Sequence, residues 1–148
     1  EVLNWFDNGK EIKNFTKPNG KPKYVIRSKQ LYGEEGLTFG KRGEVLNLQN
    51  LLPGSIFSNE GYIIKPNPSI DKFSLLGYLN SSIARYMVNM ICGLHKEVGA
   101  IKKITVPEQF SNNSFLIQKS KQCYELCSKL NLNESSKNNY NNIFSSLS

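Results

Sequence analysis

The chain has 148 residues, about the size of one domain, and is long enough to bury a core without disulfides or metals. Hydrophobic residues make up 39% of it and aromatic residues 11%, which excludes wholesale disorder, and no apolar run approaches the roughly 20 residues of a membrane helix. The formal net charge of +7 favours a polyanionic partner, nucleic acid first, although many basic domains carry such charge only for solubility.

The chain begins at Glu1 and not at Met, with a strand-like VLNWF, so we interpret it as a piece of a longer protein. Residues 1–65 are expected to be mostly strand and loop. Three stretches there are rich in β-branched and aromatic residues, namely YVIRS (24–28), SIF (55–57) and GYIIK (61–65). A turn at Asn59-Glu60-Gly61 predicts that the last two form a hairpin.

Asp7, Glu11 and Lys13 form a D…E-x-K pattern in DNGKEIK. Two carboxylates and a lysine of this kind hold Mg²⁺ and orient a water in metal-dependent nucleases. The three residues are close in the sequence, whereas nucleases space them over two strands. A solvated turn is therefore the competing interpretation.

Basic residues dominate the stretch from residue 10 to residue 29. Against Glu11 alone stand Lys10, Lys13, Lys17, Lys21, Lys23, Arg27 and Lys29, and Lys41 and Arg42 follow in a glycine-flanked GKRG loop. Such side chains neutralise phosphates and release counterions, while the interleaved Asn, Gln, Ser and Tyr can read base edges. A charge run is also a common feature of a solvated face. Its placement on turns between strands favours a binding surface.

The spacing of apolar residues predicts an amphipathic helix over 72–91, with Asp71 as its N-cap and Gly93 marking its end. Its apolar face carries Leu75, Leu79, Ile83, Tyr86 and Met90, and the opposite face carries Ser81, Arg85 and Asn89. AIKKITVP (100–107) is predicted to be a strand. A second helix is predicted over 112–130, and Tyr140, Ile143, Phe144 and Leu147 keep helical spacing in the Asn- and Ser-rich tail. Strands first and helices later indicate an α+β fold.

The three cysteines are Cys92, Cys123 and Cys127, and an odd count without a secretory signal indicates reduced thiols in the cytoplasm. Cys123 and Cys127 share one helix face and are interpreted as small core residues, with a metal site as the alternative. His95 is the single histidine, which makes a Ser-His-Asp or Cys-His arrangement improbable. No G-x-S-x-G, Walker, H-E-x-x-H or N-P-P-Y motif occurs.

Four stretches follow one another in a characteristic order: Tyr32 with EEGLTFG (34–40), LLPGSIFSNEG (51–61), LLGYLNSS (75–82) and AIKKITVPE (100–108). Together they resemble the target recognition domain of type IIG and BREX-type restriction-modification adenine methyltransferases, which have a TaqI-like C-terminal specificity domain. Phe39 stands where tryptophan is common in that family, and the stretch before Pro53-Gly54 lacks the arginine often found there.

The resemblance implies a DNA target recognition domain over residues 1–110, mixed β with one helix, and a C-terminal helical spacer or docking segment over 111–148. In it the predicted helix buries Leu75, Leu76 and Leu79 against the β region. Asn80 and Ser81 bond loop backbone, and the strand to Val106 adds an edge to the sheet. The implied DNA-contacting residues are Lys21, Lys23, Arg27, Lys29, Tyr32, Thr38, Lys41 and Arg42.

By itself this piece would be non-catalytic. The parent chain would be a site-specific adenine DNA methyltransferase, with or without endonuclease activity. S-adenosylmethionine would bind upstream in that parent, and the partners would be double-stranded DNA and the methyltransferase domain. Two alternatives stay open: a small nuclease that uses Asp7, Glu11 and Lys13, and a protein-interaction module whose basic charge is incidental.

Overall fold

The computed structural model describes residues 6–24, 26, 28–58 and 60–130. The chain divides into two compact units, Glu1–Tyr32 and Gly33–Ser148. The predicted domain boundary at residue 110 stays a prediction. The predicted features of VLNWF and of the 131–148 tail lie outside the described residues.

In the first unit the chain forms one helix, a basic loop and a short 3-10 turn. Helix α1 (Phe6–Asn14) has left-handed backbone angles at Asp7, Asn8 and Gly9, so its first turn is irregular. The turn η1 (Lys29–Leu31) follows the loop. The strand expected over 24–28 is wrong for the residues there that the structure describes, because Tyr24, Ile26 and Ser28 have no sheet partner. Val25 and Arg27 lie outside the described residues.

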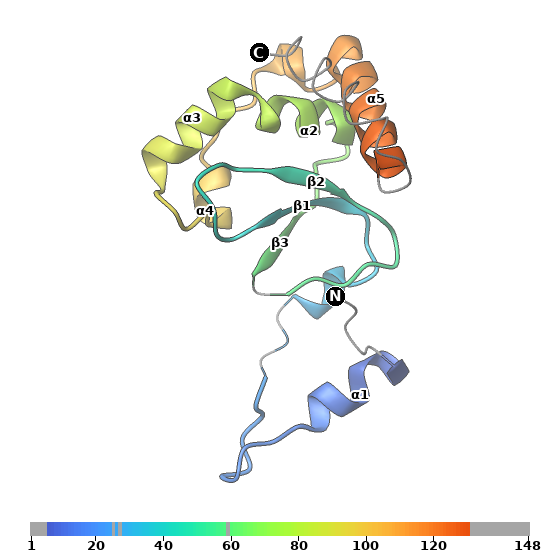
Figure 1. Cartoon of the computed structure of the whole chain (residues 1–148), viewed down its shortest axis with the longest axis vertical. Helices are drawn as coiled ribbons and strands as arrows, with labels where there is room; N and C mark the ends of the chain where they lie inside the picture. The colour runs from blue at the N-terminus through green and yellow to red at the C-terminus, as the bar shows by residue number, and fades with distance from the viewer. Residues whose placement is uncertain (1–5, 25, 27, 59, 131–148) are drawn as a thin grey trace. The chain divides into compact units, whose positions relative to one another are not determined.

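The second unit is built on a small antiparallel sheet. Strand β1 (Gly36–Gly40) lies between β2 (Leu48–Leu51) and β3 (Gly61–Ile64), so the order is β2-β1-β3 (Figure 1). In the register of the sheet, Phe39 pairs with Leu48 on one side and with Tyr62 on the other. The prediction that GYIIK forms a strand is confirmed.

The hairpin expected between SIF (55–57) and GYIIK is wrong. Residues 55–57 form no strand, and β3 pairs with β1 instead. A distant residue bonds the start of this stretch instead: the Gly33 amide donates to the Ser55 carbonyl at 2.9 Å, and the Gly33 carbonyl accepts from the Gly54 amide at 2.9 Å. The Ser55 carbonyl is therefore not available for a strand partner.

One face of the sheet is apolar and packs against helix α2 (Lys72–Asn80). Alternation places Leu37 and Phe39 of β1 on that face, where they are 0% and 2% exposed, beside Leu48 of β2. From the helix, Leu75, Leu76 and Leu79 complete this core. A single helix covering a one-sided antiparallel sheet is a common α+β solution. The α+β fold class is confirmed.

The helix predicted over 72–91 is broken into α2 and α3 (Ser82–Ile91) at Ser81. The N-cap at Asp71 is confirmed, because its carboxylate accepts from the amides of Phe73 and Ser74 at 2.8 and 3.0 Å. Ser81 has extended angles (φ −65°, ψ 155°), and its hydroxyl accepts from the Ala84 amide at 3.3 Å. Serine is favoured as an N-cap, so it starts a new helix where the periodicity alone predicts continuation.

Because of this break, α3 presents a different face to the core than the one predicted. Ala84 and Val88 are fully buried, whereas Ile83, Tyr86 and Met90 are 67%, 66% and 70% exposed. The predicted apolar face is therefore wrong beyond Ser81. The small side chains pack inward, and the large apolar ones form an exposed stripe.

Asn80 bonds backbone as expected, but its partner lies in a strand and not in a loop, and Ser81, expected to do the same, caps α3 instead. Its side-chain oxygen accepts from the Leu48 amide at 3.0 Å, and its amide nitrogen donates to the Leu48 carbonyl at 3.0 Å. Leu48 lies on β2, an outer strand of the sheet. The Asn80 side chain thus satisfies both backbone groups of Leu48 that a further strand would bond.

The strand expected over 100–107, which was to close the sheet, is wrong. The region forms α4 (Val98–Ile101), a turn, and then η2 (Glu108–Phe110). Ile101 and Ile104 are both buried and lie three residues apart, which suits a helical turn and not alternation. The predicted C-terminal helix is confirmed as α5 (Ser114–Leu130).

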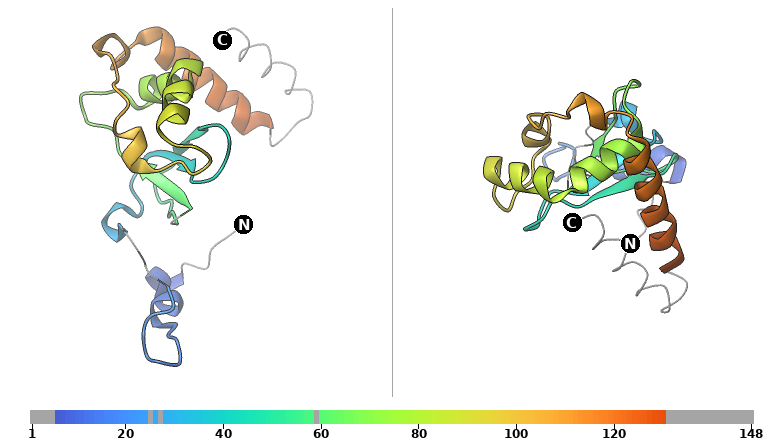
Figure 2. Two further views of the ribbon diagram at one scale, coloured as in Figure 1. Left: turned by 90° about the vertical axis from the view of Figure 1, so that its left-hand side faces the viewer. Right: turned by 90° about the horizontal axis from the view of Figure 1, so that it is seen from above.

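Helix α5 packs on α2, and the two lie side by side in both figures (Figures 1 and 2). At the crossing, a Cβ built on Gly77 would lie 2.6 Å from the Ser120 hydroxyl, so a larger residue at this position would force the packing to shift. On the same helix, Cys123 is half-buried, and burial raises the pKa of its thiol, whereas Cys127 is exposed. Among the described helices, none is long and apolar enough to cross a membrane.

Candidate nucleic-acid interface

Residues 15–24 form a short hairpin that we call the basic hairpin. The Lys23 amide donates to Phe15 and the Lys17 amide donates to Lys21, each at 2.8 Å, and Thr16 is bridged to Pro22. The turn between the arms is Lys17-Pro-Asn-Gly20. Its sequence explains the geometry, because proline sets φ at the second position and Gly20 takes a left-handed φ of +75°.

This register sorts the side chains of the hairpin onto two faces. Residues opposite each other in a hairpin share a face, and so do residues two apart along one arm. One face therefore carries Phe15, Lys17, Lys21 and Lys23, and the other carries Thr16 and Pro22. The geometry thus gathers three ammonium groups and one aromatic ring on a single small surface.

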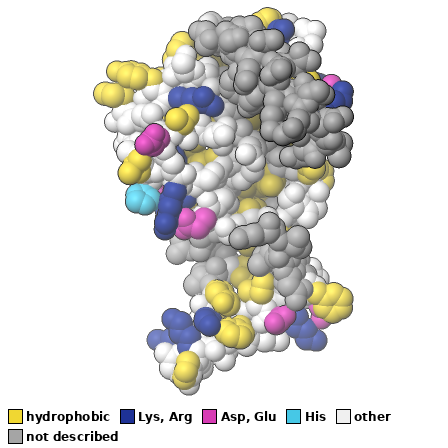
Figure 3. Space-filling view, viewed as in Figure 1, with side chains coloured by type: hydrophobic (Ala, Val, Ile, Leu, Met, Phe, Trp, Pro, Cys, Tyr) yellow, Lys and Arg dark blue, Asp and Glu magenta, His cyan; other side chains and the backbone are white. Residues whose placement is uncertain are grey.

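Two aromatic rings contact each other where the two arms of the hairpin end. The rings of Phe15 and Tyr24 lie 5.9 Å apart between centroids, and the Lys23 ammonium lies 4.5 Å from the Phe15 centroid. Phe15 is 46% exposed and Tyr24 52% exposed, so both rings stay open to solvent. Figure 3 shows Lys and Arg side chains beside exposed hydrophobic ones at the lower end of the picture, over the first unit.

The charge of the chain is concentrated in this unit. Residues 1–32 carry seven Lys and Arg against three Asp and Glu, a net charge of +4 out of the chain's +7. From residue 12 to residue 33 there is no acidic residue. Burial, and to a smaller extent the neighbouring Lys29 ammonium, lower the pKa of Lys13.

The other expected DNA contacts are distributed over both units. Lys29 begins η1, and Tyr32, half-buried, follows this turn; burial raises the pKa of its phenol. Thr38 lies in the middle of β1, and its hydroxyl donates to the Tyr62 carbonyl at 2.8 Å. Arg27 lies outside the described residues. The structure thus brings Lys21 and Lys23 together, and Lys41 and Arg42 as neighbours, but it assigns these pairs to different units.

Lys41 and Arg42 each form an ion pair with a glutamate. The sequence did not predict these pairs. The Lys41 ammonium lies 3.6 Å from Glu97, and the Arg42 guanidinium lies 3.4 Å from Glu60. Glu97 also accepts from the Tyr62 hydroxyl at 3.1 Å. The charge of the GKRG loop is therefore partly compensated, whereas no ion pair is described within the basic hairpin.

Backbone pairing with a distant segment, residues 95–96, holds this loop. Arg42 is bridged to His95, and the Lys96 amide donates to the Lys41 carbonyl at 2.7 Å. Lys96 itself is only 1% exposed, and its ammonium donates to the Gly93 carbonyl at 2.6 Å. The Arg42 side chain is 76% exposed, so its guanidinium remains accessible beside its partner Glu60.

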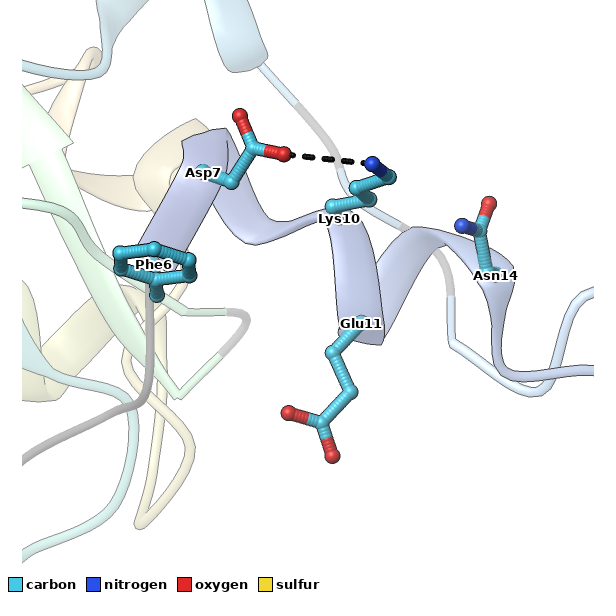
Figure 4. Close-up of a pocket in the computed structure, with 5 residues that line it drawn as sticks. All are labelled: Phe6, Asp7, Lys10, Glu11 and Asn14. Carbon is cyan, nitrogen blue, oxygen red and sulfur yellow. Dashed lines mark ion pairs between the residues drawn. The ribbon is translucent and has the colours of Figure 1, made fainter.

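The three residues of the nuclease alternative lie on α1, and its two carboxylates do not converge. Asp7, Glu11, Phe6, Lys10 and Asn14 line a pocket of about 300 Å³. Asp7 pairs with Lys10 at 3.5 Å, and the Asp7 and Glu11 carboxylates point to different sides of the helix (Figure 4). Among the described residues, no group of three or more His, Cys, Asp and Glu side chains is placed to hold a metal ion.

A scan against protein-family models and a comparison with curated proteins both found no match to this chain.

Proposed function

We propose that the chain is a DNA-binding domain that serves as the target recognition part of a restriction-modification adenine methyltransferase. The observation that carries the DNA-binding part is the basic hairpin, where Lys17, Lys21 and Lys23 share one face in a stretch without acidic residues. Three ammonium groups on one exposed surface neutralise neighbouring phosphates and release counterions. The assignment to a methyltransferase is supported by the ordered motifs alone.

Within this proposal, the basic hairpin and the GKRG loop make different contacts with DNA. The lysines of the hairpin contact phosphates, which positions the domain without reading sequence. Arg42 is the candidate for reading a base, because its exposed planar guanidinium fits the guanine edge and a lysine ammonium does not. Glu60, at 3.4 Å, orients that guanidinium.

The proposal is tested by fluorescence anisotropy of the full chain with duplex DNA over a range of salt concentrations. We expect affinity that falls steeply with salt. The variant Lys17→Gln/Lys21→Gln/Lys23→Gln should make the slope of log affinity against log salt shallower by about three, since each phosphate contact contributes about 0.9.

The matched control is Lys102→Gln/Lys103→Gln/Lys129→Gln, which removes the same charge from exposed positions of the second unit. It should leave the slope nearly unchanged. No duplex binding at low salt by folded protein would refute the proposal. Equal losses in the two triple variants would mean that net charge, and not the hairpin, drives binding.

A further inference from the structure

Two aromatic rings of the basic hairpin are not explained by phosphate contacts. Phe15 and Tyr24 are 46% and 52% exposed, and they contact each other at a centroid distance of 5.9 Å with an interplanar angle of 31°. All the buried hydrophobic residues of the described chain lie between Leu37 and Ile104, so neither ring belongs to the core. The pair thus offers open aromatic surface on a basic loop.

Lys23 contacts these rings, and two further lysines lie on the same hairpin. The Lys23 ammonium lies over the Phe15 ring at 4.5 Å from its centroid and 5.9 Å from the Tyr24 centroid, so a base that stacks on Phe15 takes the other face of the ring or displaces this flexible side chain. Lys17 and Lys21 share the face of Phe15 further along the hairpin. Proteins that hold single-stranded nucleic acid combine these two elements, rings that stack on bases and cations that follow the backbone.

We propose that the basic hairpin binds an unpaired nucleotide of DNA, with the Phe15–Tyr24 pair stacked on its base and the three lysines on the adjoining phosphates. This inference rests on the proposed DNA-binding function. It specifies that the hairpin binds DNA at a nucleotide whose base is unpaired. In a paired duplex the base faces are covered by their neighbours, so the rings gain a partner only where a base has left the stack. The lysines bind either form.

The test compares two oligonucleotides of equal length and charge with the full chain. One is oligothymidylate, and the other has the same sugar-phosphate backbone without bases. Phosphate contacts are the same in both, so any difference in affinity comes from contacts with the bases. We expect oligothymidylate to bind tighter on the order of tenfold for each stacked base.

The variant Phe15→Leu keeps an apolar side chain but removes the ring. It should bring the two oligonucleotides to nearly equal affinity while leaving binding of the abasic one unchanged. The matched control is Phe115→Leu on α5, because Phe115 is 54% exposed and also has a lysine, Lys119, at 5.8 Å from its centroid. This control should retain the full preference for oligothymidylate. Tyr24→Trp should increase that preference, since the indole offers a larger stacking surface.

Equal affinity of the unmodified chain for the two oligonucleotides would overturn the inference. So would a parallel loss of both affinities in Phe15→Leu, which would mean that the rings only hold the two arms of the hairpin together. Duplex binding is measured separately, so the two proposals fail independently. Intact salt-dependent duplex binding without a preference for bases removes the stacking alone, and absent duplex binding removes the proposed function.

Discussion

The Asn80 side chain bonds the backbone of Leu48 on the outer strand β2, as a further strand would do at that residue. Its side-chain amide bonds both the amide and the carbonyl of Leu48, each at 3.0 Å, in a half-buried environment. Leaving buried backbone groups without partners costs about 1–3 kcal/mol. A side chain that offers a donor and an acceptor in one plane is therefore favoured here, which explains why an asparagine ends α2.

We predict that Asn80→Ala lowers the free energy of unfolding by about 1–3 kcal/mol, because the Leu48 amide and carbonyl both lose their partner. Urea denaturation followed by circular dichroism measures this. Asn89→Ala, at an exposed position of α3, is the control and should change the stability by less than about 0.5 kcal/mol. Similar small effects from both substitutions would contradict the role given to Asn80.

An ion pair gives one predictable dependence of stability on pH. The Lys72 ammonium donates to Glu35 at 2.6 Å, and this hydrogen bond, with the charge of Lys72, lowers the pKa of the Glu35 carboxyl from 4.5. A carboxyl with a lowered pKa in the folded state contributes stability above its unfolded pKa and loses it as pH falls through the folded value. The effect is small, because the carboxylate is exposed.

We therefore expect Glu35→Gln to be slightly less stable than the parent at neutral pH, with a difference that disappears well below pH 4.5. Denaturant unfolding at a series of pH values measures the difference. Glu44→Gln removes another exposed charge outside the described ion pairs and serves as the control. A difference between Glu35→Gln and the parent that grows on acidification would show that the sign is wrong.

At the scale of elements, the sequence predicts those features that depend on local chemistry. The cap at Asp71, strand β3 and helix α5 follow from a capping side chain, β-branched residues and helical periodicity. The break at Ser81 is not predicted, because a serine inside a periodic pattern reads as one polar position of a continuous helix. The residue directly before that break is Asn80, whose side chain bonds Leu48 of β2. This long-range contact is not visible in a local pattern.

Gly77 sets the distance between α2 and α5. Glycine within a helix costs about 1 kcal/mol relative to alanine, so Gly77→Ala would stabilise an isolated helix. Here the added Cβ would lie 2.6 Å from the Ser120 hydroxyl and 3.4 Å from Leu116 Cδ2, and overpacking of this kind costs about 1–3 kcal/mol. The steric term is the larger one, so glycine remains the better residue at this position.

We predict that Gly77→Ala lowers the melting temperature and that Ser120→Ala, which removes the nearest clashing atom, restores part of the loss. Thermal unfolding of the two single variants and the double variant forms a double-mutant cycle that isolates the contact. The control is Gly99→Ala in α4, where a new Cβ meets nothing within 4 Å. Additive effects of Gly77→Ala and Ser120→Ala would show that the helices do not meet through these two residues.

At the scale of the whole molecule, the candidate site was predicted in its charges but not in its geometry. The lysines of the basic hairpin are evident from composition, and Asn19-Gly20 predicts a turn. Phe15 and Tyr24 come together because of the register of the hairpin. That register was not predicted, since residues 24–28 were expected to form a separate strand. Likewise, the partners Glu97 and Glu60 of the GKRG loop come from distant positions in the chain.

The division into two units separates the core from most of the positive charge. All the buried hydrophobic residues that the structure describes belong to residues 33–148, which carry a net charge of only +3. Residues 1–32 contribute +4 and none of that core. Stability follows buried apolar area and DNA affinity follows positive charge, so the two properties should separate when the chain is cut between the units.

We predict that residues 33–148, expressed without residues 1–32, unfold cooperatively with a melting temperature close to that of the full chain. The same protein should bind duplex DNA with a much shallower dependence on salt, because the hairpin lysines are gone. Thermal unfolding by circular dichroism and anisotropy with duplex DNA measure the two properties in one preparation. A large loss of melting temperature would mean that the first unit supports the core. A retained salt slope would instead move the DNA contacts to the second unit, where Arg42 and Lys41 would be the first residues to substitute.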